Sequence, residues 1–127
     1  MSLDITPVTP EGRQVIQKYG DGGFQIAGIA YRSSVLVMAE TSEPWDVTKP
    51  EMITPTSLAG FFQDGVGPDI MLIGCGPRFV APPKGLRQSL KEQGAVLEWM
   101  DTGAACRTFN VLLTEERQVV AALIAVQ

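Results

Sequence analysis

The chain has 127 residues and a mass of 13.7 kDa, with 45% apolar side chains, 19% charged side chains and a mean hydropathy of +0.11. This length predicts a single domain, 1–127, and this composition excludes a wholly disordered chain. Fourteen acidic side chains outnumber ten basic ones, which argues against a nucleic-acid partner. The chain contains no histidine, so a Ser-His-Asp triad, a Cys-His dyad and a histidine metal site are excluded, and no metal is predicted.

The N-terminal segment and the cysteine count bear on location. Residues 1–14 are polar and interrupted by Pro7 and Pro10, which predicts a poorly ordered or extended tail rather than a signal peptide. No apolar run is long enough to form a transmembrane segment. Two cysteines, Cys75 and Cys106, are too few for a disulfide scaffold. We therefore expect reduced thiols and a cytoplasmic location.

The first half of the chain, residues 1–54, is rich in strand formers and turn residues, which predicts meandering antiparallel strands. A hairpin is expected from Val15 to Phe24, because the glycines at 20, 22 and 23 permit the positive φ of a tight turn. The remaining expectations are strands at 29–31 and 35–38, a turn at 33–34, a loop at 43–46 and an extended stretch at 47–53.

The second half alternates strands and helices, which predicts βαβ crossovers and an α/β fold. A short helix is expected at 56–63, capped by Thr54 or Thr56 and broken at 65–68. A strand at 69–73 and a helix at 84–93 ended by Gly94 follow. The last expected elements are a strand at 95–100, a helix from the Asp101-Thr102 cap to about residue 113, and a strand at 118–126. The strands at 69–73 and 119–126 lack polar alternation, so we expect both of their faces to be covered.

A glycine-rich bend, 74–78, directly follows the first of these buried strands. Gly74 and Gly76 allow close approach of the backbone to a ligand, at the strand end where open α/β sheets bind ligands. Phe79 occupies the place of the third glycine of a dinucleotide fingerprint, and no P-loop lysine follows, so no nucleotide cofactor is predicted. The alternative is a tight turn with no ligand.

A second bend, 101–107, leads from the next strand into a helix. Small residues at 103–105 leave the first amides of that helix accessible, and such amides stabilise anions. The alternative is that Asp101 or Thr102 caps these amides.

Two residues of the second bend carry further expectations. Arg107 lies among small and apolar residues, so we expect a buried ion pair with Asp101 or Glu98, with substrate contact as the alternative. Cys106 lies near the helix N-terminus beside Arg107, which favours its thiolate. A separate hypothesis makes Cys75 and Cys106 a redox pair, which requires Cα atoms within about 7 Å.

The strands that precede the two bends are predicted to be parallel neighbours, so the bends are expected to meet at one edge of the sheet. This convergence predicts a crevice for an anionic ligand. Its residues are Gly74, Cys75, Gly76, Arg78, Asp101, Thr102, Ala104, Cys106 and Arg107.

The segment from Met100 to Leu112, with its Asp-Thr-Gly-Ala-Ala-Cys-Arg-Thr core, resembles a family of unknown function that has the Mth-type fold and includes the mitochondrial complex I assembly factor three. The segments 19–24, 33–37 and 72–76 and Trp45 follow the same order as in that family, and the resemblance spans about residues 15–126. It implies a three-layer β/α fold, in which a mixed central sheet is backed by helices and a small antiparallel strand layer comes from the N-terminal half.

The resemblance also implies a function. It implies a bacterial, non-enzymatic protein-interaction or assembly factor, linked to biogenesis of a membrane respiratory complex, with respiratory-complex or membrane-insertion components as partners. The alternative is a protein or enzyme that binds a small anion or small molecule in the crevice near Gly76, Thr102 and Arg107. Exposed strand edges in the first half suit either a monomer or a dimer.

Overall fold

The computed structural model describes residues 3–4, 13–62, 67–115 and 118–127. The first half contributes β1 (Leu3–Asp4), β2 (Ile16–Gly20), β3 (Gly23–Ile26), β4 (Ile29–Tyr31), β5 (Ser34–Val37), β6 (Ser42–Trp45) and the 3-10 helices Pro50–Met52 and Thr56–Phe61. The second half contributes β7 (Ile70–Gly74), α1 (Leu86–Glu92), β8 (Val96–Met100), α2 (Thr102–Thr114) and β9 (Val119–Leu123).

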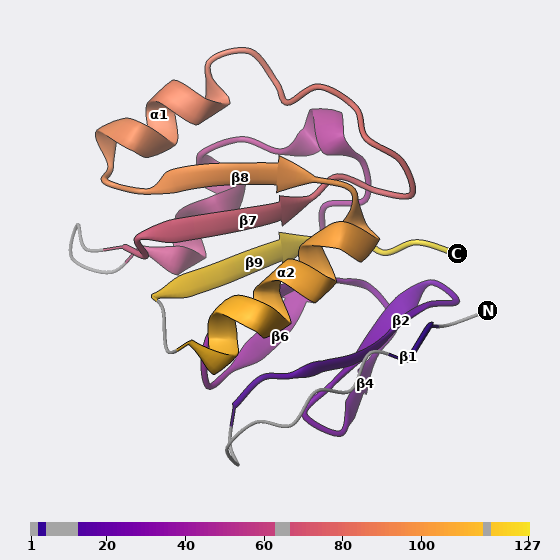
Figure 1. Ribbon diagram of the computed structural model, residues 1–127. Helices are drawn as coiled ribbons and strands as arrows, with labels where there is room; N and C mark the ends of the chain where they lie inside the picture. Colours follow the sequence, from indigo (N-terminus) through magenta and orange to yellow (C-terminus); the bar gives the residue numbers. More distant parts are fainter. Residues whose placement is uncertain (1–2, 5–12, 63–66, 116–117) are drawn as a thin grey trace.

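The central sheet has the strand order β6-β5-β9-β7-β8. In it β7 pairs in parallel with both β8 and β9, whereas β5 pairs antiparallel with β9 and β6. The sheet is therefore mixed, as predicted (Figure 1). The parallel pairing of β7 and β8, predicted from the alternation of strands and helices, is confirmed.

Apolar side chains cover both faces of this sheet. The cluster on the α1 side includes Met71, Ile73, Cys75, Leu86, Leu90, Leu97, Trp99, Val120 and Ala122. The cluster on the α2 side includes Ile16, Phe24, Leu72, Cys106, Phe109, Leu113, Val119, Ala121 and Leu123. Because β7 and β9 contribute to both clusters, the prediction that these strands are covered on both faces is confirmed.

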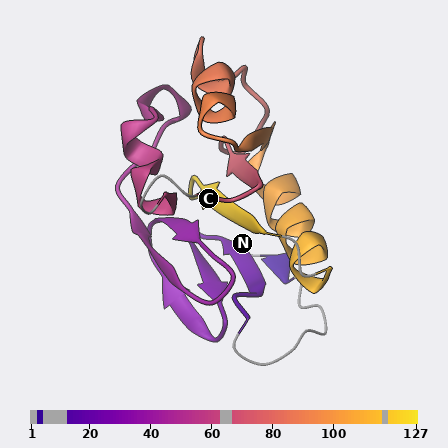
Figure 2. The ribbon, with the colours of Figure 1, turned by 90° about the vertical axis from the view of Figure 1, so that its left-hand side faces the viewer.

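A second, smaller sheet has the order β1-β2-β3-β4 and is antiparallel throughout. Its β2–β3 turn has positive φ at Gly20, Asp21 and Gly22, as the glycine-rich sequence predicted. Gly23 is required as well, because a Cβ there would overlap the carbonyl oxygen of Tyr31. The small sheet and α2 lie on one side of the central sheet, and α1 lies on the other side (Figure 2). The predicted three-layer β/α fold is therefore confirmed.

Two expectations for the first half are wrong. The segment 43–46, predicted as a loop, lies mostly in β6. This strand is at the edge of the sheet, where Pro44 is tolerated because its missing N–H is not needed for pairing. The stretch 47–53, predicted as extended, contains the 3-10 helix Pro50–Met52, whose first position suits the fixed φ of proline.

Element boundaries elsewhere differ by a few residues. Ser34, predicted in a turn, already belongs to β5. The predicted helix at 56–63 is the 3-10 helix Thr56–Phe61, with the Thr54 hydroxyl accepting from the Ser57 N–H at 3.1 Å. Position 63, the break at 65–66 and most of the predicted tail at 1–14 lie outside the described residues.

Candidate functional site

The two bends predicted to converge are joined directly by hydrogen bonds. The Cys75 N–H donates to the Met100 carbonyl at 2.8 Å, and the Thr102 N–H donates to the Gly76 carbonyl at 2.9 Å. These bonds continue the parallel pairing of β7 and β8 beyond the strand ends. The predicted juxtaposition of the bends is therefore confirmed, whereas a ligand at this place stays a prediction.

The hydroxyl of Thr102 occupies the centre of the joined bends. Its Oγ1 accepts from the Gly76 N–H at 3.1 Å and donates to the Ile124 carbonyl at 2.7 Å, and the side chain is fully buried. A Cβ at Gly74 would lie 2.8 Å from the Thr102 Cα, so only glycine permits this approach. Thr102 thus ties the ends of β7 and β9 to the start of α2.

The N-terminus of α2 is capped by Asp101. Its Oδ1 accepts from the Ala104 N–H at 2.9 Å, and its backbone is extended, as expected of a cap. Ala104 itself is half-buried. The Asp101 carboxylate therefore occupies one of the main-chain amides that were predicted to be accessible to an anion.

The expected buried ion pair of Arg107 is wrong. Arg107 is exposed, and its guanidinium donates to the Tyr19 hydroxyl at 3.0 Å rather than pairing with Glu98 or Asp101. The side chain therefore lies against β2 and makes a neutral hydrogen bond there, with no carboxylate as its partner. Tyr19 lies 88 positions away along the chain, so no local pattern predicted this partner.

Tyr19 reaches α2 at a second point. A Cβ at Gly103 would lie 2.7 Å from the Tyr19 hydroxyl oxygen, so the tyrosine of β2 packs over the first turn of the helix. Deeper in the same contact, Asn110 accepts from the Ile16 N–H and donates to the Ile16 carbonyl, both at 2.9 Å. Neither Tyr19 nor Asn110 was predicted from the sequence to join the two halves of the chain.

The thiolate form of Cys106 is disfavoured, contrary to the expectation from its position near the helix N-terminus beside Arg107. It is fully buried, and burial raises the pKa of its thiol far above the usual range, against the smaller lowering effect of Arg107. Cys75 packs in the cluster on the α1 side and Cys106 in that on the α2 side, and both are free thiols. This placement on opposite faces of the sheet gives no support to a redox pair.

The residues around the bends differ in exposure. Gly74, Cys75 and Gly76 are buried, whereas Arg78 is exposed and its carbonyl accepts a weak hydrogen bond from the Cys75 thiol at 3.6 Å. Within the described residues, no group of three or more Cys, Asp and Glu side chains is arranged to hold a metal ion.

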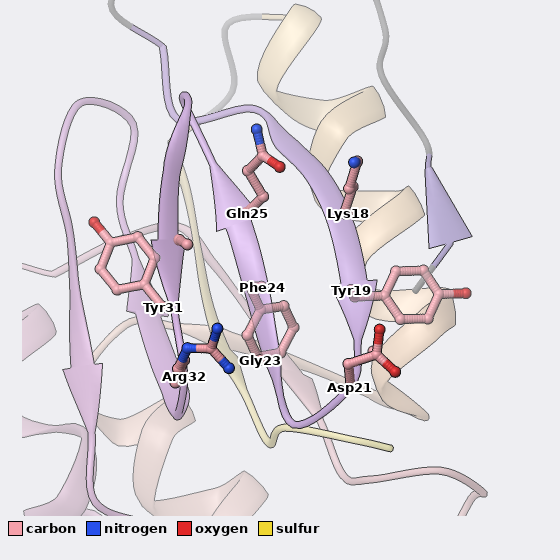
Figure 3. A pocket seen from close by; sticks show the side chains of 10 residues that line it. Lys18, Tyr19, Asp21, Gly23, Phe24, Gln25, Tyr31 and Arg32 are labelled. Carbon is pink, nitrogen blue, oxygen red and sulfur yellow. The ribbon is translucent and has the colours of Figure 1, made fainter. Parts of the chain in front are cut away.

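A pocket of about 160 Å³ lies elsewhere, on the small sheet (Figure 3). Side chains of both charges line it, and no spacing in the sequence signalled it. The labelled residues are Lys18, Tyr19, Asp21, Gly23, Phe24, Gln25, Tyr31 and Arg32.

These features define a mixed α/β protein whose candidate site is a pair of strand-end bends tied together by a buried threonine. Residues 16–124 match the family described as a protein of unknown function (DUF498/DUF598), and the chain belongs to this family. No helix in the described part of the chain is both long and apolar enough to cross a membrane.

Relatives of the chain include proteins with and without a described role. An uncharacterized protein of Rhodobacter capsulatus is 38% identical over 89% of this chain and 86% of its own length. The NADH dehydrogenase (ubiquinone) 1 alpha subcomplex assembly factor 3 of Danio rerio is 32% identical over 97% of this chain and 71% of its own length. The human protein of that name is 30% identical, and the match covers only 59% of its length.

Solved structures show the same fold. A Bartonella henselae protein described as an outer membrane protein superposes with a TM-score of 0.82, at 37% identity over 92% of this chain and 98% of its own. A Bordetella pertussis protein described as an Mth938-like domain superposes with a TM-score of 0.77, at 27% identity over 97% of this chain and 92% of its own. The Mth-type fold expected from the resemblance is therefore confirmed.

Proposed function

We propose that this protein is a non-enzymatic assembly factor, which acts through protein contacts during biogenesis of a membrane-bound respiratory complex. The observation that carries the proposal is the similarity to assembly factors of the respiratory NADH dehydrogenase, which extends over 97% of the chain in the Danio rerio protein. Such coverage includes both sheets and α2. The partners proposed are subunits of that complex or components that insert them into the membrane.

The chemistry of the joined bends supports a role without catalysis. The Thr102 hydroxyl and the Asp101 carboxylate are both engaged by main-chain groups of this protein. The Cys106 thiol is protonated at neutral pH, because burial raises its pKa. Nucleophilic catalysis needs an activated group beside a base, and the chain offers no histidine for that purpose. The two free thiols also suit the cytoplasmic location that we propose.

Deletion of the gene in its host cell tests this proposal. We expect a several-fold fall in assembled NADH dehydrogenase, measured on native gels and as NADH oxidation by isolated membranes, with recovery when the chain is re-expressed. Succinate oxidation by the same membranes is the control and should not change. Undiminished NADH dehydrogenase in the deletion strain, with no respiratory subunit cross-linked to the tagged chain, would contradict the proposal.

A second proposal is an anionic small molecule bound beside the bends. The exposed side chains of Arg78 and Arg107 at their border favour it. A ligand specific for the native state must raise stability, so a panel of phosphates, carboxylates and nucleotides should contain one that raises the melting temperature. Because Arg107 is exposed, Arg107→Ala should alter stability by less than about 1 kcal/mol while abolishing that shift, and Arg32→Ala should retain it. An unchanged melting temperature across the panel rejects this proposal.

A further inference from the structure

A basic stretch lies within this acidic chain. Between Arg78 and Lys91 there are four basic residues and no acidic one, although the whole chain has a net charge of −4. The other two cations of the stretch are Lys84 and Arg87. A local excess of positive charge therefore exists within a chain that is acidic overall.

Large apolar side chains are exposed in the same stretch. Phe79 is 62% exposed, more than any other large apolar side chain in the described part of the chain, and Val80 is 40% exposed. They belong to a run, residues 77–81, in which every residue is exposed. Exposed apolar side chains that gather at one place indicate an interaction site more often than single ones do.

Two hydrogen bonds hold this loop and α1 against the same strand. The Trp99 indole N–H donates to the Val80 carbonyl, and the Arg87 guanidinium donates to the Leu97 carbonyl, both at 2.6 Å. Leu97 and Trp99 are two positions apart on β8, about 7 Å along a strand. The apolar part of the loop and the Arg87 side of α1 therefore lie next to each other.

Their place in the molecule leaves this surface accessible. The strand β8 is at the edge of the central sheet, and α1 and the preceding loop form the end of the molecule farthest from the small sheet (Figure 1). Lys84 and Lys91 are exposed there, and Lys91 lies one helical turn after Arg87. The next acidic residues along the chain are Glu92, at the end of α1, and Glu98, whose side chain alternates to the other face of β8 from Leu97 and Trp99.

We propose that this surface, formed by Arg78, Phe79, Val80, Lys84, Arg87 and Lys91, docks the protein on an anionic phospholipid bilayer. The cations complement the negative headgroups, and each contributes about 1 kcal/mol near such a surface. Aromatic and aliphatic side chains partition into the boundary between headgroups and acyl chains, which requires a protruding group and no complementary pocket. That requirement favours a bilayer over an acidic protein segment as the occupant.

Flotation of the purified protein with lipid vesicles tests the docking. We expect binding to vesicles of phosphatidylcholine with phosphatidylglycerol and not to phosphatidylcholine alone, with binding weakened by salt. The double variant Lys84→Glu/Lys91→Glu should lower the affinity about tenfold or more, because it reverses two charges. Phe79→Ser should also weaken binding. All three side chains are exposed, so melting temperatures should stay near that of the unaltered protein.

Matched substitutions on the small sheet serve as controls. Lys18→Glu/Arg32→Glu reverses two exposed charges, and Ile29→Ser removes an apolar side chain that is 57% exposed. Both should bind vesicles as the unaltered protein does. Absence of flotation with anionic vesicles, or equal losses in the control variants, would overturn the docking. So would binding of a soluble polyglutamate peptide without any binding to vesicles, which would identify an acidic protein segment as the occupant. Because only purified protein and lipid are used, failure here is separate from failure of the assembly role.

Discussion

A single buried hydroxyl decides how the joined bends are held. Thr102 accepts from one strand end and donates to another, so its hydrogen-bonding capacity is used within the protein. The sequence placed Thr102 beside a glycine-rich bend as one of two cap candidates, but the cap of α2 is Asp101. The sequence did not indicate that Ile124 would be the acceptor, because the carbonyl of a residue 22 positions away leaves no local pattern.

Cys106 makes stability depend on pH in the alkaline range. Burial raises the pKa of its thiol in the folded protein, whereas the thiol of the unfolded chain has a pKa of about 8.5. The raised pKa contributes stability that is fully present below about pH 8.5 and is lost as pH rises further, by about 1.4 kcal/mol per pH unit for one proton.

The comparison of Cys106→Ala with the unaltered protein tests this dependence. Urea unfolding at pH 7 and at pH 10 should give a smaller loss of unfolding free energy in the variant, since it has no thiol at this position to ionise on unfolding. Parallel declines in the two proteins would show that Cys106 ionises as easily in the folded state as in the unfolded state.

At the scale of elements, the second half of the chain was predictable because its signals are local. Leu86 and Leu90 lie four apart and are buried, Gly94 has φ +91°, and Asp101 caps α2. The strand β6 was missed because Pro44 normally argues against a strand. Only its position at the sheet edge, set by pairing with β5, makes the proline acceptable.

The contact between β2 and α2 could not be predicted in the same way, and it provides the next test. Alanine normally stabilises a helix relative to glycine by up to about 1 kcal/mol. Gly103→Ala should instead destabilise this protein, because the new Cβ would lie 2.7 Å from the Tyr19 hydroxyl oxygen.

Tyr19→Phe removes that oxygen and leaves the ring carbon at 3.1 Å as the nearest atom. The cost of Gly103→Ala should therefore shrink by about 1 kcal/mol in the Tyr19→Phe background, measured as a double-mutant cycle by denaturant unfolding. Additive effects would mean that the ring and the helix do not meet as the structure describes.

At the scale of the whole molecule, α2 is the element that both sheets share. One side of it packs on β7 and β9, and the side chain of Asn110 binds both main-chain polar groups of Ile16 in β2. Ile16 lies beside an irregular register in β2, where the regular ladder does not satisfy every main-chain group. The small sheet is thus fixed to the rest of the molecule by polar as well as apolar contacts.

Asn110→Ala tests whether this attachment is as specific as the hydrogen bonds suggest. The substitution leaves the N–H and the carbonyl of buried Ile16 without their side-chain partner, so the free energy of unfolding should fall by about 2–4 kcal/mol. Amide hydrogen exchange should accelerate more in β2 and β3 than in β7 and β9, because the small sheet then opens before the central sheet does. The adjacent Val111→Ala, at a side chain that is 57% exposed, should change stability by no more than about 0.5 kcal/mol. If exchange accelerated equally in all four strands, the two sheets would unfold as one unit, and Asn110 would contribute to overall stability without holding the small sheet in particular.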